Sequence, residues 1–215
     1  SIYVKIARDY RITQDSERSI AYNGGNLKLI DTVIFDIGNV LVGFSGSTWE
    51  KFLQSHGAQK EDFEKIADAT VRSDDWSEYD KGVLTDAQII NLFVENDPSI
   101  ENQIRSTFTD LKGVVDKRDY AIDWIKGLKD KGMKVLFLSN FSKTAEHDNP
   151  DAMSFLSFTD GGILSYKDKV IKPDPAIYRL LIERYDLVPE NCVFIDDTQK
   201  NLDAAEKIGI KTILF

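Results

Sequence analysis

Short, mainly apolar runs recur along the chain without polar alternation, and the first three end at small or acidic residues. Four segments follow this pattern: 32–35, 134–138, 192–195 and 211–215. Continuous apolar runs of this length are typical of strands that are covered on both faces, as they are in a parallel sheet. The pattern therefore predicts four buried strands.

Segments with a helical spacing of apolar residues separate these runs. Residues 120–132 end at a glycine, residues 175–185 begin with a proline, and residues 201–208 end before a glycine. Proline at the start and glycine after the end are common helix boundaries. Helices that alternate with buried strands predict an α/β fold with a Rossmann-like parallel sheet, whose ligand site lies outside the carboxyl ends of the strands.

A different pattern occupies the stretch after the first predicted strand. Residues 45–115 are rich in charged side chains and carry apolar residues at helical spacing, with glycines and an Asp-Pro pair as interruptions. Such interruptions break helices, so this pattern predicts an all-α insertion of several short helices. The Rossmann-like core then comprises residues 31–44 and 116–215.

Residues 1–30 form an N-terminal extension before the first predicted strand. Ile2, Val4 and Ile6 alternate with other side chains as in a strand, and residues 23–26 consist of asparagine and glycine, which favour a turn. This pattern is compatible with a hairpin at the sheet edge.

The charge of the chain narrows the range of partners. Its 215 residues include 27 Lys and Arg against 36 Asp and Glu, for a formal charge of −9. Nucleic acids and anionic membranes need a cationic surface, and the sequence has no long basic run, so we expect neither as a partner. The sequence leaves the oligomeric state open.

Other features bear on the location and the redox chemistry of the protein. No apolar stretch reaches the roughly 20 residues of a transmembrane helix, and the N-terminus lacks a signal-peptide pattern. We therefore expect a soluble, cytoplasmic protein. Cys192 is the single cysteine, which excludes an internal disulfide and a structural zinc site made of thiolates.

Polar groups stand where the predicted strands end, and one more lies in a loop. They are Asp36, Ser139-Asn140, Lys172 and Asp196-Asp197. Taken singly, each has an ordinary role as a helix cap, a turn residue or a solvated lysine. Taken together, they place three carboxylates, a hydroxyl and an ammonium at one rim of the sheet.

Carboxylates this close repel one another unless a cation lies among them. A hard divalent ion takes oxygen ligands and is the natural companion of such a cluster. A lysine and a hydroxyl beside that ion suit a ligand rich in anionic oxygens. Phosphate fits this description.

In order and in strand context, these groups resemble the four motifs of the haloacid dehalogenase superfamily. The segments that carry the resemblance are Phe35-Asp36-Ile37-Gly38-Asn39-Val40, Leu138-Ser139-Asn140, Lys172-Pro173-Asp174, and Ile195-Asp196-Asp197 followed by Asn201. The resemblance covers residues 30–215. The insertion at 45–115 is similar to the helical cap of that family, and Tyr79-Asp80-Lys81-Gly82 with Thr85 resembles a stretch seen in such caps.

The resemblance implies a magnesium-dependent reaction through an aspartyl-phosphate. Asp36 would be the nucleophile. The family pattern assigns Mg²⁺ to the carboxylates of Asp36 and Asp197 and to the backbone carbonyl of Gly38, with Asp196 in direct or water-mediated support. Asn201 would orient the acidic pair.

The same resemblance assigns the binding of the phosphoryl group. Ser139 and the backbone amide of Asn140 would contact phosphoryl oxygens, and Lys172 would pair with both Asp36 and the phosphate. Dehalogenases of the family do not keep the acidic pair Asp196-Asp197, so the pair favours phosphate over halide.

Gly38 departs from the family pattern, which usually has a second Asp at this position. That Asp serves as general acid to the leaving group and as general base to water, a contribution typically worth about 10²–10⁴-fold in rate. Three interpretations follow. The substrate has a leaving group that needs little protonation, another side chain or water substitutes, or the site no longer turns over.

We therefore expect a Mg²⁺-dependent phosphatase of a small phosphorylated metabolite. A sugar phosphate is a candidate because the Asp-x-Gly-Asn version of the first motif resembles a subgroup of small sugar phosphatases. The alternative is a non-catalytic phosphate-binding or interaction module descended from such an enzyme. Two further residues have weaker signals: we expect His147 to be solvated, and Trp76 to lie in the core of the cap or at the rim of the site.

Overall fold

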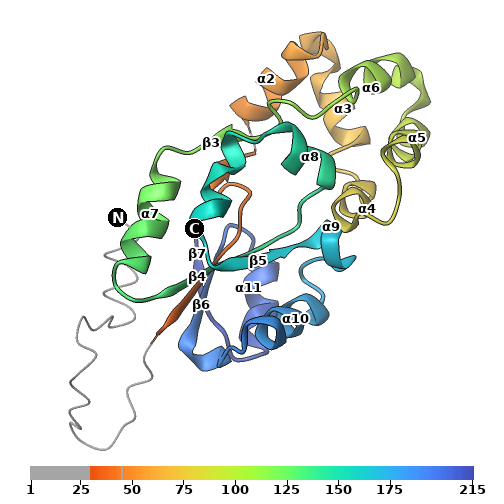
Figure 1. Cartoon of the computed structure of the whole chain (residues 1–215). Coiled ribbons are helices and arrows are strands. Elements are labelled where there is room, and N and C mark those ends of the chain that lie inside the picture. Colours follow the sequence, from red (N-terminus) through yellow and green to blue (C-terminus); the bar gives the residue numbers. More distant parts are fainter. Residues whose placement is uncertain (1–29, 45) are drawn as a thin grey trace, which may run out of the picture.

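The structure, a computed structural model, describes residues 30–44 and 46–215 (Figure 1). A central parallel sheet has its strands in the spatial order β5-β4-β1-β6-β7. The strands are β1 (Thr32–Phe35), β4 (Lys134–Ser139), β5 (Gly161–Leu164), β6 (Cys192–Asp196) and β7 (Lys211–Leu214). This arrangement confirms the predicted α/β fold with a parallel sheet core. The hairpin predicted within residues 1–30 lies outside the described residues, Ile30 excepted.

Alternate side chains of the strands enter two separate hydrophobic clusters. Val33 and Phe35 of β1 point into one cluster, whereas Ile34 between them points into the other. Because successive side chains of a strand face opposite sides of the sheet, both faces of this sheet must be apolar. This requirement explains the continuous apolar runs in the sequence.

Helices cover both faces of the sheet (Figure 1). Helix α7 (Tyr120–Lys129) contributes Trp124 and Leu128 to the first cluster, and α10 (Pro175–Tyr185) contributes Tyr178 to the second. The remaining core helices are α8 (Lys143–Asp148), η3 (Ala152–Phe158), α9 (Ser165–Asp168), η4 (Pro189–Asn191) and α11 (Gln199–Glu206). The predicted helices at 120–132, 175–185 and 201–208 are present, with ends that differ by at most three residues.

The stretch between β1 and β4 contains a group of helices that we call the cap. Its members are α2 (Ser47–Ser55), η1 (Lys60–Asp62), α3 (Phe63–Ala69), α4 (Asp75–Lys81), α5 (Asp86–Asn96), η2 (Pro98–Ile100) and α6 (Glu101–Thr107). Aromatic rings fill its interior, and Trp76 stacks on Phe93 with a centroid separation of 5.9 Å. The insertion after the first core strand is therefore all-α, as predicted.

A short two-stranded sheet lies where the chain enters and leaves the cap. Strand β2 (Val42–Gly43) pairs antiparallel with β3 (Asp116–Lys117). The two crossings between core and cap are thus bonded to each other, which ties the cap to the core near the end of β1.

Strand β5 was not predicted from the sequence, because its Gly-Gly-Ile-Leu segment carries only two apolar side chains. Among the described residues, no helix is long and apolar enough to cross a membrane.

Candidate functional site

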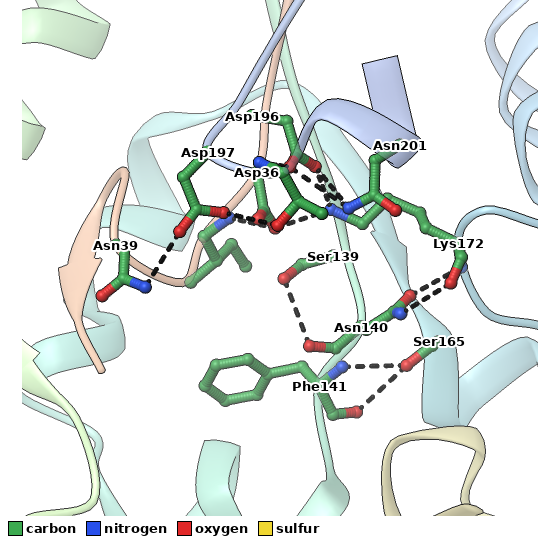
Figure 2. Close-up of polar contacts among 12 residues, drawn as sticks. Asp36, Asn39, Ser139, Asn140, Phe141, Ser165, Lys172, Asp196, Asp197 and Asn201 are labelled. Carbon is green, nitrogen blue, oxygen red and sulfur yellow. Dashed lines mark hydrogen bonds and ion pairs between the residues drawn. The ribbon is translucent and has the colours of Figure 1, made fainter. Parts of the chain in front are cut away.

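Three carboxylates meet at the carboxyl edge of the sheet (Figure 2). Asp36 follows β1, Asp196 ends β6, and Asp197 is next to it; one oxygen of each lies within 4.8 Å of the others. The register brings them together, because Phe35 lies opposite Ile195 in the adjacent parallel strands. Asp36 and Asp196 are buried and Asp197 is half-buried.

Lys172 is the cation of this cluster. Its Nζ lies 2.8 Å from Oδ1 of Asp36 and 2.6 Å from Oδ2 of Asp196, and the side chain is buried. Burial acts to lower the pKa of Lys172, but the charges of Asp36 and Asp196 outweigh it and raise that pKa above its ordinary value. Lys172 is therefore a positively charged ammonium shared by two carboxylates.

One ammonium does not neutralise the cluster. Burial raises the pKa of Asp36 to about 6, although Lys172 acts to lower it. Three carboxylates and one ammonium leave a formal charge of −2 when all are ionised. Because the oxygen donors are close together and undercompensated, the cluster fits a hard divalent cation such as Mg²⁺.

Asp196 has its oxygens engaged by the protein. Asn201 donates its amide to both oxygens, at 3.2 and 3.1 Å, and the backbone N–H of Thr198 donates at 2.7 Å. With Lys172 as a further donor, Asp196 is a fixed anchor for the cluster. Asn201 bonds to Asp196, and in the described part of the chain none of its hydrogen bonds reaches Asp197, so the orientation expected of Asn201 applies to Asp196.

Asp197 is positioned by a residue to which the sequence analysis assigned no role. The amide of Asn39 donates to Oδ2 of Asp197 at 2.9 Å, and Asn39 Oδ1 accepts from the Phe44 backbone at 3.1 Å. Asn39 has a left-handed backbone, with φ of 58°, a conformation that asparagine tolerates better than most residues. Its place directly after Gly38 in the first motif was the signal that could have identified it.

The second motif lies beside Asp36. Ser139 is buried, and its hydroxyl helps to lower the pKa of Asp36 as a minor contribution after burial and Lys172. The side chain of Asn140 bonds both backbone groups of Lys172, accepting from its N–H at 2.7 Å and donating to its carbonyl at 2.9 Å. Asn140 therefore fixes the loop that carries Lys172, a positioning role that its sequence context did not suggest.

The cap closes over this edge of the sheet and leaves a small cavity of about 50 Å³. Gly38 and Asn140 line it from the core, while Trp76 and Asp80 line it from the cap. Trp76 thus has both expected roles, since it also packs against the aromatic rings inside the cap. His147 lies outside, with its side chain 84% exposed, which agrees with the solvated position expected for it.

Known proteins show the same fold and related sequences. The chain is 28% identical over 192 residues to mouse Acyl-CoA dehydrogenase family member 10, a match that covers 84% of this chain and 17% of that protein. It is 21% identical to the sesquiterpene phosphatase astK of Aspergillus oryzae, over 82% of this chain and 85% of the relative. A solved haloacid dehalogenase family enzyme from Bacteroides thetaiotaomicron, in complex with magnesium and inorganic phosphate, superposes with a TM-score of 0.63 at 21% identity, covering 86% of this chain and 93% of that one.

A family model also matches most of the chain. The model describes haloacid dehalogenase-like hydrolases, and it matches residues 30–209, which include four of the five strands of the sheet, the cap and the whole acidic cluster. The resemblance of the four motifs is thereby confirmed at the level of the superfamily. This chain belongs to the haloacid dehalogenase-like hydrolases.

Proposed function

We propose that the protein is a Mg²⁺-dependent phosphatase that hydrolyses a small phosphorylated metabolite through an aspartyl-phosphate on Asp36. The main support for this proposal is the cluster of charged side chains, in which Lys172 bridges Asp36 and Asp196 and Asp197 lies beside them. The sesquiterpene phosphatase among the relatives and the phosphate-bound structural neighbour support this choice over halide chemistry.

The chain's own residues supply most of the first chemical step. An oxygen of Asp36 attacks phosphorus in line, and the bond to the leaving oxygen breaks. Lys172 holds Asp36 in place and, together with Ser139 and the backbone amide of Asn140, offers donors to the phosphoryl oxygens. Water then attacks the phosphorus of the aspartyl-phosphate and releases phosphate.

The acidic cluster would hold the metal. Asp36 and Asp197 would supply carboxylate oxygens, Gly38 its backbone carbonyl, and Asp196 would support them through its fixed position. When bound, Mg²⁺ supplies positive charge between an anionic nucleophile and an anionic substrate. The four groups come from two strand ends, so the assembled sheet creates this ligand set.

Phosphate release distinguishes this proposal from the alternative that the protein is a non-catalytic module descended from a phosphatase. We expect the protein to hydrolyse p-nitrophenyl phosphate and acetyl phosphate with Mg²⁺. Removing the metal with a chelator should lower the rate by about 10²–10³-fold, since metal ions contribute several kcal/mol to transition-state stabilisation. Phosphate assays with Mg²⁺, with chelator, and with Mg²⁺ restored would measure this. A metal-independent background rate throughout would favour the module.

The contact between Asn39 and Asp197 predicts a loss of metal affinity in Asn39→Gly. Glycine keeps the left-handed backbone at no steric cost and removes only the amide. Groups that orient a metal ligand typically affect affinity 10–100-fold, and we expect Mg²⁺ binding to weaken by about that factor, as measured by calorimetry.

A matched control exists for this variant. Asp186 also has a left-handed backbone, with φ of 50°, and is exposed at the end of α10. Asp186→Gly should bind Mg²⁺ like the unmodified protein. If Asn39→Gly matched it, the amide of Asn39 would have no part in positioning Asp197.

A further inference from the structure

The site has an open space where the family usually has a second carboxylate. Gly38 lines the cavity between core and cap, and a Cβ built on it would meet no heavy atom of residues 30–44 and 46–215 within 4 Å. Core residues therefore leave the position of the missing acid and base unfilled. A side chain that substitutes for this acid and base would enter the same cavity from elsewhere.

Asp80 is the acidic residue that the cap contributes to this cavity. It lies in the last turn of α4 and lines the cavity together with Gly38 and Asn140. Among the hydrogen bonds and ion pairs of residues 30–44 and 46–215, none involves its carboxyl group. Because Asp80 lines the cavity and its carboxyl group has no such bond, this carboxyl is available to a substrate.

The backbone of Asp80 is fastened to the core. Ser165, which is fully buried, donates its hydroxyl to the carbonyl of Asp80 at 2.6 Å and accepts the backbone N–H of Phe141 at 2.9 Å. Phe141 follows the second motif, and Figure 2 shows its contact with Ser165. Together with the bond from Ser165 to Asp80, this contact connects the core side of the cavity to the end of α4. Gly82, just after α4, lies so close to Tyr166 that a Cβ there would come within 2.7 Å of it.

We propose that Asp80 supplies, from the cap, the general acid and base that Gly38 lacks. This inference rests on the proposed phosphatase function. As the bond between Asp36 and phosphorus forms, the bond from phosphorus to the leaving oxygen breaks, and the Asp80 carboxyl gives its proton to that oxygen. The Asp80 carboxylate then takes a proton from the water that attacks phosphorus, the bond from Asp36 to phosphorus breaks, and the starting state returns.

The electrostatic surroundings of Asp80 suit a proton donor at neutral pH. Burial, and after it the charge of Asp36, raises the pKa of Asp80 to about 8, while Lys172 acts to lower it. A bound divalent cation would lower this pKa further and a phosphoryl group would raise it, so the position of the carboxyl carries the inference. Because Asp80 belongs to the cap, the proton donor is present only while the cap is docked on the core.

The test uses three substrates whose leaving groups differ in their need for a proton. They are p-nitrophenyl phosphate, phenyl phosphate and glycerol phosphate. Asp80→Asn keeps the shape and removes the acid, and we expect it to slow glycerol phosphate hydrolysis by about 10²–10⁴-fold and p-nitrophenyl phosphate by less than about 10-fold. Glu78→Gln, on the same helix outside the cavity lining, should leave all three rates unchanged.

A second variant tests whether an acid at position 38 can replace the acid at position 80. Gly38→Asp in the Asp80→Asn background should recover most of the glycerol phosphate rate, because the Gly38 position has room for a side chain. If Asp80→Asn lowered the hydrolysis rates of all three substrates equally, Asp80 would act only through the structure of the cap. If it lowered none of them, Asp80 would take no part in catalysis. Either result would overturn this inference and leave the proposed phosphatase function standing. Absence of Asp36-dependent hydrolysis of p-nitrophenyl phosphate in the unmodified protein would overturn the proposed function, and this inference with it.

Discussion

Asp36→Asn should abolish turnover, with an expected loss of roughly 10⁴–10⁶-fold, the range seen when single catalytic residues are removed from an enzyme that uses covalent catalysis. A neutral amide is a poor nucleophile, and it cannot form the aspartyl-phosphate. The substitution keeps the shape of a buried side chain that lies 2.8 Å from the Lys172 ammonium. Loss of activity should therefore occur without loss of the fold.

Two measurements check this result. Steady-state phosphate release with Mg²⁺ gives the rate, and mass spectrometry of acid-quenched protein after acetyl phosphate addition reports a phosphoryl adduct that Asp36→Asn should lack. Asp123→Asn, an exposed position on α7, serves as the control for the amide substitution. Retention of more than a few per cent of the rate in Asp36→Asn would rule out Asp36 as the nucleophile.

Lys172→Met should have the largest effect on stability. It leaves Asp36 and Asp196 buried without the ammonium that both of them contact. Breaking a buried ion pair by removing one partner typically costs about 3–5 kcal/mol. We expect a decrease of that size in the free energy of unfolding of the metal-free protein at pH 7, measured by urea denaturation in the presence of a chelator.

The decrease in the free energy of unfolding caused by Lys172→Met, here called the deficit, should depend on pH in a definite direction. The pKa of Asp36 is already raised to about 6 by burial, with Lys172 opposing that effect, and loss of Lys172 should raise it further. An acid whose pKa is higher in the folded state binds more protons folded than unfolded, so its contribution to stability improves as the pH falls through that pKa.

The deficit of Lys172→Met should therefore be largest at pH 7 and shrink toward pH 5, and added Mg²⁺ should reduce it at pH 7. Lys65→Met, at an exposed position of α3, should show no such deficit. A deficit that stayed constant with pH would mean that lost packing of the lysine stem, and not the unpaired carboxylates, is responsible.

Local sequence patterns were sufficient to predict most of the fold. The strand at Thr32–Phe35 was predicted with its observed bounds, because apolar residues on both faces of a buried strand produce an uninterrupted run. The edge strand at Gly161–Leu164 was missed, since its two glycines carry no side chains and its place beside β4 depends on tertiary pairing.

The same division applies to the site. Asp36, Ser139, Lys172 and Asp196-Asp197 were found from their place at strand ends, because the carboxyl ends of parallel strands meet at one edge. Asn39 and Asp80 also lie in segments that resemble the family, but nothing in those segments indicates which groups the two residues contact. Asn39 lies 158 residues from the carboxylate that it holds, and Asp80 lies 85 residues from the serine that bonds its backbone.

The class of fold, the acidic cluster and the absence of a carboxylate at Gly38 could thus be predicted from the residues alone, since these features depend on residue type and on order along strands. The folded chain was needed to show that Lys172 is shared by two carboxylates, that Asn39 contacts Asp197, and that Asp80 and Gly38 line the same cavity. Hydrogen bonds and electrostatic interactions act over a few ångströms in space. The separation of two residues along the sequence does not specify their distance in space, which is set only when the sheet has assembled and the cap has packed on the core.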